Sequence, residues 1–375
     1  MAHKPISLAT PFLLVEQTVL ARNHLRLIES LDALGTEVRL RPHVKAHKCG
    51  TLARFQVDNG CVGVCAATVS EALLAAKAGA EDILVANELA SAASVANLLR
   101  VAAAFPNAKL RVCVDSFPLV RLLSDACARN HAIGVLVEVN AGQDRCGSHP
   151  DNVVAIARAV IQAGLAFDGI QCYQGMLQHV RDAAERRDRV NNSAVAIARV
   201  CRDRLLAAGI PCPIISGGGT GTFTTEASSG VFTEIQAGSY LFMDADYSKN
   251  EPEPGVRFEC SLFVVATVIS VDPQRRWAVL DAGLKAVSLD SGPPVVVGYE
   301  NTLTYKSGGD EHGIVSCATD PEPSPLPDTI VVGMQVRLIP GHCDPTINLY
   351  QELVVVKDGI MSEIWDIGAH YSARI

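Results

Sequence analysis

Short runs of β-branched and apolar residues alternate with longer amphipathic stretches over most of the first 240 residues. The longer stretches place apolar residues at i, i+3, i+4 and i+7, as in VSEALLAAKAGA and DNVVAIARAVIQAG, which is the period of a helix packed on one face. Eight strand–helix units in succession predict an α/β fold, a parallel (β/α)8 barrel. The expected strands are at 37–40, 61–65, 82–85, 110–114, 133–139, 167–173, 212–216 and 232–238.

The pattern changes after about residue 250. Short β-rich runs are there separated by Gly, Pro, Asp and Asn, which predicts an antiparallel β domain. Lys357, Asp358 and Gly359 lie between two such runs and predict a hairpin turn. We therefore expect a barrel at 20–248 and a β-rich domain formed by 1–19 plus 249–375. The apolar run PFLLV at 11–15 could add a strand to either part.

Composition narrows the class of protein. With 49% hydrophobic and 19% charged residues among 375, the chain is typical of a globular protein, and charged residues interrupt every apolar run before it could cross a membrane. The net charge is −8, and the sequence lacks the clustered basic residues that a nucleic-acid-binding surface would need. The ERRDR run at 185–189 is interpreted as a solvated helix face. We expect a cytoplasmic protein whose 12 cysteines, without a C-x-x-C pair, are reduced core residues.

Polar residues that could bind a ligand or take part in a reaction lie at the predicted carboxyl ends of the strands. That end of a barrel is where enzymes place their active sites, and the loops after strands 7 and 8 commonly bind phosphate. The residues in question are Lys45 after the first strand, Arg145 after the fifth, Tyr173 at the end of the sixth, SGGGTGT (216–222) after the seventh and Tyr240 after the eighth.

The glycine run and a lysine together suggest a cofactor. Consecutive glycines leave backbone N–H groups open to an anion, although a flexible turn is the simpler explanation of glycines alone. A phosphate site facing a lysine suggests pyridoxal phosphate (PLP), whose aldehyde Lys45 would hold as a Schiff base. Lys48 is the rival lysine and is interpreted as a solvated charge. His43 and His47 are interpreted as hydrogen-bonded loop residues.

Several ordered motifs extend this picture to nearly the whole chain. They are RPHVKAHK (41–48), VEVNAGQDRCG (137–147), GGGTGT (217–222), TEIQAGSYLFMDADY (233–247) and GHCDPTINL (341–349). With these motifs the sequence resembles the D-threonine aldolase and D-serine dehydratase family, whose members have the alanine-racemase-like architecture.

The resemblance implies roles for particular residues. Lys45 would carry PLP, Arg145 would lie at its phenolic oxygen, Tyr173 near its ring, and His179 near the substrate hydroxyl. The implied phosphate ligands are Gly218, Gly219, Thr220 and Tyr240. The chain departs from the family at Gln174, where a histidine is usual, and at His370, where an arginine is expected.

The resemblance also implies a divalent metal held by His342 and Asp344. In an extended segment, residues two apart project to one face, so Cys343 would point elsewhere. Without the resemblance, these would be polar turn residues before Pro345. A carboxylate ligand suits Mn²⁺ or Mg²⁺, whereas a register shift that made Cys343 the ligand would favour Zn²⁺.

The function these expectations favour is a PLP- and metal-dependent aldolase. It would cleave D-threonine-like D-β-hydroxy-α-amino acids to glycine and an aldehyde. The main alternative is a dehydratase of D-serine or 3-hydroxy-D-aspartate, giving a 2-oxo acid and ammonia. A non-catalytic PLP-binding protein and an amino-acid racemase are compatible with the same fold. The resemblance implies a homodimer, and we expect neither a nucleic-acid nor a membrane partner.

Overall fold

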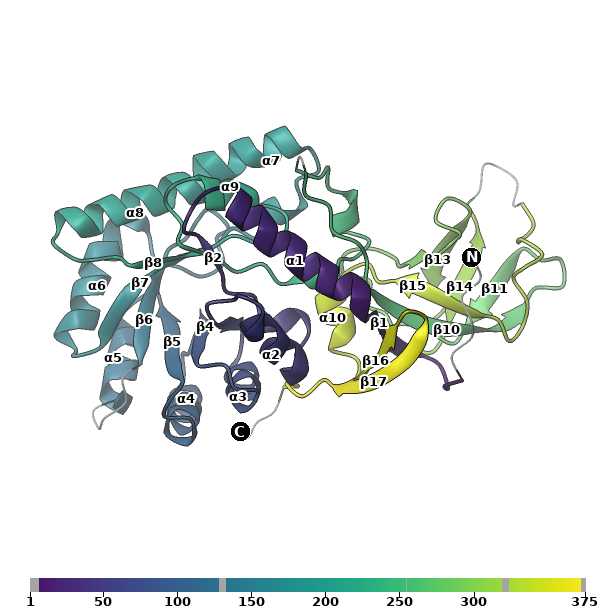
Figure 1. The fold of residues 1–375 in the computed structure, drawn as a ribbon, viewed down its shortest axis with the longest axis horizontal. Helices are drawn as coiled ribbons and strands as arrows, with labels where there is room; N and C mark the ends of the chain where they lie inside the picture. The colour runs from purple at the N-terminus through teal and green to yellow at the C-terminus, as the bar shows by residue number, and fades with distance from the viewer. Residues whose placement is uncertain (1–6, 128–132, 254, 319–323, 372–375) are drawn as a thin grey trace. The chain divides into compact units, whose positions relative to one another are not determined.

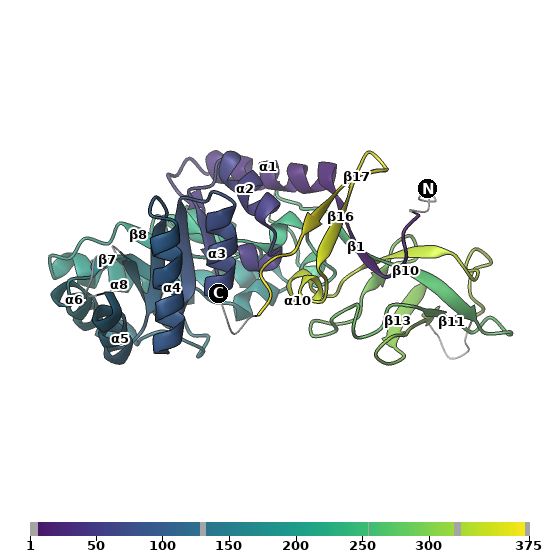
Figure 2. The same ribbon diagram turned by 90° about the horizontal axis from the view of Figure 1, so that it is seen from below.

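The computed structural model describes residues 7–127, 133–253, 255–318 and 324–371 (Figures 1 and 2). The chain divides into two compact units, each assembled from three stretches. The barrel unit comprises 26–238, 250–256 and 368–375, and the β unit comprises 1–25, 239–249 and 257–367. The barrel was expected to extend to residue 248, but the segment 239–249 groups with the β unit. Residues 1–6 of the expected β-rich domain lie outside the described residues.

Eight parallel strands form the barrel unit's sheet in the order β2-β9-β8-β7-β6-β5-β4-β3. The edge strands β2 and β3 are linked by a bridge between His43 and Cys65, where the Cys65 N–H donates to the Pro42 carbonyl at 2.8 Å. Each of the eight predicted strands is therefore confirmed. Their bounds are β2 Arg39–Leu40, β3 Val64–Ala66, β4 Asp82–Glu88, β5 Lys109–Val114, β6 Gly134–Glu138, β7 Ala166–Cys172, β8 Ile214–Gly217 and β9 Glu234–Ile235.

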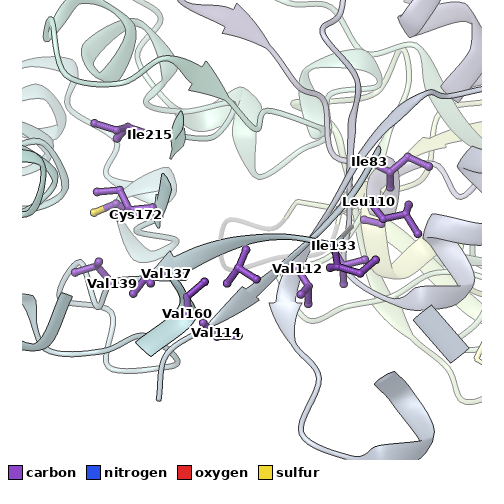
Figure 3. Close-up of a cluster of buried hydrophobic side chains, with 14 of the residues drawn as sticks. Ile83, Leu110, Val112, Val114, Ile133, Val137, Val139, Val160, Cys172 and Ile215 are labelled. Carbon is purple, nitrogen blue, oxygen red and sulfur yellow. The ribbon is translucent and has the colours of Figure 1, made fainter. Parts of the chain in front are cut away.

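Helices follow the strands and pack on the outer face of this sheet (Figure 1). Alternate strand residues such as Ile83, Val112 and Val137 form the large apolar cluster with helix residues such as Val160 (Figure 3). Leu84 and Leu136, the neighbours along the same strands, belong to a separate small cluster, as the two-residue period requires. These helices are α2 Gly50–Asp58, α3 Val69–Lys77, α4 Ala92–Ala104, α5 Phe117–Cys127, α6 Val153–Gln162, α7 Ala183–Val190, α8 Ala196–Ala207 and α9 Phe223–Ser228. Helix α1 (Gln17–Ala33) precedes the first barrel strand, and its residues 17–25 group with the β unit.

The basic run on α7 is not the fully solvated face that the sequence suggested. Arg186 is buried, and its guanidinium donates to the carbonyls of Val180 and Glu251. Arg187 pairs with Glu253 at 2.7 Å. The sequence alone does not show these contacts, because Glu251 and Glu253 lie more than 60 residues away along the chain.

The β unit is a mixed sheet in the order β13-β14-β11-β10-β1-β16-β17, with β15 pairing to β10 and β12. β1 (Phe12–Glu16) lies antiparallel to β10 and parallel to β16, so the PFLLV run belongs to this unit. Asp358 and Gly359 both have positive φ and connect β16 to β17, which confirms the predicted hairpin. The other elements are β10 Leu262–Val271, β11 Trp277–Leu280, β12 Val295–Val296, β13 Leu303–Ser307, β14 Gly313–Cys317, β15 Gln335–Ile339, α10 Cys343–Ile347, β16 Glu352–Lys357 and β17 Ile360–Asp366.

The 12 cysteines are all free thiols, and most are buried, as the sequence predicted. Among the described residues, no helix combines the length and the apolar character that crossing a membrane would require.

Candidate active site

Lys45 lies on a tight turn directly after the first barrel strand. The 3₁₀ turn Val44–Ala46 begins after His43, whose Nδ1 accepts the Lys45 N–H at 3.5 Å. The flanking Val44 and Ala46 are buried, whereas Lys45 is half-buried. Gly238, after the last barrel strand, packs on this turn so closely that a Cβ there would come within 2.9 Å of the His43 carbonyl. The turn thus fixes the backbone of Lys45 between buried neighbours, while Lys45 itself stays partly exposed.

His47 on the same loop has a structural role. It is fully buried, its Nδ1 accepts the Cys49 N–H at 3.0 Å, and its Nε2 lies 3.2 Å from Gln56 Oε1. Because Nδ1 accepts, the ring is neutral and Nε2 donates to Gln56. The interpretation as a hydrogen-bonded loop residue therefore holds for His47.

Lys48 was wrongly interpreted as a solvated charge. Its side chain is only 8% exposed, and its Nζ lies 3.7 Å from Glu71 Oε1 and 5.1 Å from the ring centre of Tyr371. Burial of the charge is tolerated because a carboxylate and an aromatic face surround it. Lys48 thereby ties the loop to α3 and to the C-terminal segment of the barrel unit.

Arg145 and Tyr173 come together at the carboxyl ends of β6 and β7. The guanidinium carbon of Arg145 lies 5.8 Å from the ring centre of Tyr173, which is a cation–π distance. A residue pair that was predicted only as two separate cofactor contacts is therefore one stacked unit.

The sequence analysis missed a row of hydrogen-bonded polar side chains on the neighbouring barrel strands. Gln171 Nε2 donates to Glu138 at 2.8 Å, and Gln236 Nε2 donates to Gln171 at 2.9 Å and to Ser216 at 3.0 Å. Burial and the nearby carboxyl group of Glu88 raise the pKa of Glu138 to about 8. The signal was present in the interruption of otherwise apolar strand ends by Glu and Gln.

The glycine loop (216–222) follows β8 as predicted. Gly218 has φ +70°, which an L side chain rarely adopts, and Gly219 and Gly221 pack against Gln178 with no space for a Cβ. The Gly221 N–H donates to Gln178 Oε1 at 2.9 Å, and the Gly219 N–H to Thr222 Oγ1 at 3.3 Å. The N–H groups of Gly219 and Gly221 thus donate to protein side chains, so fewer backbone N–H groups of the loop are left to bind an anion.

The structure shows the surroundings of the two departures from the family pattern. The buried Gln174 accepts the Met176 N–H at 2.9 Å and so holds the turn Met176–His179, at whose end His179 is exposed. His370 lies in the C-terminal segment, and its Nε2 is buried without a hydrogen-bond partner among the described residues.

The remaining predicted residues belong to the β unit. Tyr240 is fully buried, and its hydroxyl lies 2.9 Å from Nδ1 of His24 on α1. His342 is the residue before α10, so the segment is not extended as predicted. Pro345 is the reason, because proline fits the first turn of a helix, where its missing N–H costs nothing.

His342 is oriented by a residue that the sequence analysis did not assign, Asp244. Asp244 Oδ2 accepts from His342 Nδ1 at 2.7 Å and from the Cys343 N–H at 3.0 Å, while its Oδ1 accepts the Tyr247 N–H at 2.8 Å. These bonds occupy the carboxylate, and they leave Nε2 as the nitrogen that a metal would use. Asp244 lies in the LFMDADY motif, but its partner is 98 residues away.

The residues present fit a divalent cation. His342 Nε2 and Asp344 Oδ1 are 4.0 Å apart, and two donors about 2.1 Å from one ion are at most about 4.2 Å apart. Asp244, His342 and Cys343 also place donor atoms within 4.8 Å of one another. Cys343 is fully buried, burial holds the pKa of its thiol well above the usual range, and Sγ donates to Asp344 at 3.3 Å. The donor set at this turn is therefore imidazole and carboxylate.

Comparison with known proteins agrees with this geometry. Residues 19–246 match the family described as "Alanine racemase, N-terminal domain", and residues 261–356 match "Putative serine dehydratase domain". The chain is 44% identical to a D-threonine aldolase of an Arthrobacter species over 90% of this chain and 87% of the relative. It is 38% identical to a 3-hydroxy-D-aspartate aldolase of Paracoccus denitrificans over 96% and 92% of the two chains.

A solved structure gives the same result for the fold. The crystal structure of D-threonine aldolase from Filomicrobium marinum matches with a TM-score of 0.89 and 38% identity, over 96% of both chains. The match covers both the barrel unit and the β unit. The chain therefore belongs to the D-threonine aldolase family, PLP-dependent lyases with an alanine-racemase-like fold.

Proposed function

We propose that this protein cleaves D-β-hydroxy-α-amino acids of the D-threonine type to glycine and an aldehyde, with PLP on Lys45 and a divalent cation on His342 and Asp344. The observation that carries the proposal is the His342 turn, where Asp244 directs the imidazole Nε2 toward the carboxylate of Asp344. A nitrogen and a hard oxygen donor suit Mn²⁺ or Mg²⁺, and Zn²⁺ is the softer alternative.

Each residue has a stated task in this proposal. Lys45 holds the cofactor's aldehyde, the Arg145–Tyr173 pair orients its ring, and the glycine loop with Tyr240 binds its phosphate. When bound, PLP supplies an electron sink for the carbon–carbon cleavage, and the cation supplies a Lewis acid for the substrate hydroxyl. His179 takes the proton from the β-hydroxyl group, the Cα–Cβ bond then breaks to release the aldehyde, and Cα gains a proton to give glycine.

Product identification by mass spectrometry tests the reaction. The purified protein is incubated with PLP, Mn²⁺ and D-threonine, with and without EDTA, and L-threonine is the matched control. We expect glycine and acetaldehyde from D-threonine, loss of both with EDTA, and no product from L-threonine. Turnover unaffected by EDTA would contradict the metal role.

Dehydration is the second candidate function. It is favoured by the match of residues 261–356 to a serine dehydratase domain, a span that includes His342 and Asp344. In the same assay, 2-oxobutyrate and ammonia from D-threonine would establish it and would direct attention to Cys343 as a ligand.

We also propose that the protein is a homodimer. Ile360 and Ile364 on β17 expose 73% and 47% of their surface, which a partner subunit would cover. Sedimentation velocity at micromolar concentration tests this, and a fully active monomer would contradict it.

A further inference from the structure

A buried carboxyl group lies directly behind the glycine loop. Glu226 belongs to α9, which begins immediately after the loop, and is 2% exposed. Its Oε1 accepts the Thr222 hydroxyl at 2.9 Å, while its Oε2 has no hydrogen-bond partner among the described residues. A Cβ on Gly218 would lie 3.3 Å from the carboxyl carbon of Glu226. The glycine at position 218 therefore brings the loop backbone onto this acid.

Thr222 connects the acid to the loop. Its hydroxyl donates to Glu226 and accepts from Gln178 Nε2 at 2.8 Å and from the Gly219 N–H at 3.3 Å. A hydroxyl has one hydrogen and two lone pairs, so Thr222 has no capacity left for a ligand. It is a junction rather than a phosphate contact.

Gln178 completes the connection. Its Oε1 accepts the Gly221 N–H at 2.9 Å, and it lies in the turn Met176–His179. The chain of hydrogen bonds Glu226–Thr222–Gln178 thus holds two loop amides and ends beside His179. One row of hydrogen bonds therefore connects the acid to both the glycine loop and the turn that carries His179.

The charge state of Glu226 follows from its surroundings. A carboxylate with one hydrogen bond and no cation is costly to bury, and burial raises the pKa of Glu226 to about 8 against a bond from Thr222 that lowers it.

Within the described part of the chain, the cations on the surrounding elements are committed to other acids. Glu234 pairs with Arg41, Arg186 and Arg187 pair with Glu253, and Arg189 pairs with Glu185. The remaining titratable group on the helices next to α9 is Asp188 on α7. The pKa of the buried Cys172 thiol on β7 is raised chiefly by burial, and to a lesser extent by Cys201 and Glu226.

We propose that Glu226 is a positioning residue of the phosphate site. Its uncharged carboxyl group, acting through Thr222 and Gln178, holds the glycine loop in the form that binds the phosphate of PLP. Loss of the proton places a negative charge behind the loop, where it repels the phosphate. This inference rests on the proposed function, because it assumes that the loop binds PLP.

The test compares PLP dissociation constants from pH 6.5 to 9.5 for the parent protein and three variants. Glu226→Gln keeps the shape without the charge, Thr222→Val removes the junction, and Glu37→Gln is a control that neutralises an exposed carboxylate. We expect the parent to lose about tenfold in affinity as pH rises through 8, and Glu37→Gln to follow it. Glu226→Gln should lack this step, and Thr222→Val should bind at least about tenfold more weakly at every pH.

Inorganic phosphate is the second probe, because it cannot react with Lys45. Calorimetric titration of the PLP-free protein should show the same pH step in the parent and its absence in Glu226→Gln. Identical pH profiles for these two proteins, with either probe, would overturn the inference. A parent that binds phosphate but no PLP would instead overturn the proposed function, so the two failures are distinguishable.

Thermal unfolding of the PLP-free protein provides a readout independent of binding. A pKa raised from 4.5 to about 8 means that the folded state holds its proton more tightly than the unfolded chain. The parent should therefore lose stability across that window as pH rises, and Glu226→Gln should not. A Tm for Glu226→Gln below that of the parent at pH 9 would contradict the burial of an uncharged acid.

Discussion

The Lys45 loop of the barrel unit and the His342 turn of the β unit are both short polar segments after a strand, but they use their histidines in opposite ways. His47 has both ring nitrogens hydrogen-bonded, one to the Cys49 N–H of the same loop and the other to Gln56 on α2. His342 has one nitrogen fixed by Asp244 and the other 4.0 Å from a second acidic residue. A histidine with both ring nitrogens hydrogen-bonded to a turn and its neighbouring helix supports the backbone, whereas His342 is oriented by Asp244 toward a second acidic group.

The largest effect should come from Lys45, the partly exposed lysine of the loop. We expect Lys45→Ala to lower kcat/KM at least about a thousandfold and to abolish the absorbance band of bound PLP, because the Schiff base needs the amine of this residue. Absorbance spectroscopy and product assays measure both effects. Lys48→Ala is the matched control, and it should keep the band but lose about 1–3 kcal/mol of stability because Glu71 loses a buried partner. The reverse pattern would exchange the roles of the two lysines.

A smaller but still severe loss is expected at the second predicted ligand. Asp344→Asn replaces an anionic donor with a neutral amide and should lower metal-dependent turnover at least about 100-fold. Asp328→Asn, an exposed carboxylate of the same unit, should have no effect. Activity measured against Mn²⁺ concentration after EDTA treatment gives the comparison. Unchanged Mn²⁺ dependence in Asp344→Asn would point to Cys343 instead.

Asp244 should affect the metal indirectly, through its hydrogen bond to the ligand His342. Asp244→Asn weakens the bond that fixes the tautomer of His342, and we expect Mn²⁺ affinity to fall about 10–100-fold while turnover at saturating Mn²⁺ largely returns. Turnover that saturating Mn²⁺ fails to restore would mean that Asp244 contributes directly to the reaction.

The mildest outcome is expected at His47. His47→Leu removes two buried hydrogen bonds and should lower the free energy of unfolding by about 1–3 kcal/mol, measured by urea denaturation. The PLP band of the folded variant should remain. Loss of that band without a change in stability would contradict a purely structural His47.

The sequence predicted the secondary-structure elements better than the conformation of the His342 turn. The eight barrel strands and the hairpin at Asp358 depend on local periodicity and turn chemistry, and all were found. The extended conformation expected through 342–344 was wrong from Cys343 onward, where α10 begins, because Pro345 ends an extended run and begins a helix equally well. Local pattern alone could not decide between these two uses of proline.

Pairings across long sequence separations could not be predicted at all. Asp244 with His342, Arg186 with the carbonyl of Glu251, and Lys48 with Tyr371 depend on the folded path of the chain. The row from Glu138 to Ser216 was likewise missed, because each member looks like an isolated polar residue on its own strand. Local signals predict elements, and side-chain partners follow only from the fold.

The cysteines are distributed over both units, so their reactivity can report where the folded chain opens locally. Nine cysteines lie in the barrel unit and three, Cys260, Cys317 and Cys343, in the β unit. Burial raises the pKa of thiols such as Cys65, Cys113 and Cys343, so alkylating reagents reach a reactive thiolate only when the surrounding structure opens. Labelling rates read by peptide mass spectrometry would therefore report local opening separately for each unit, without any added probe.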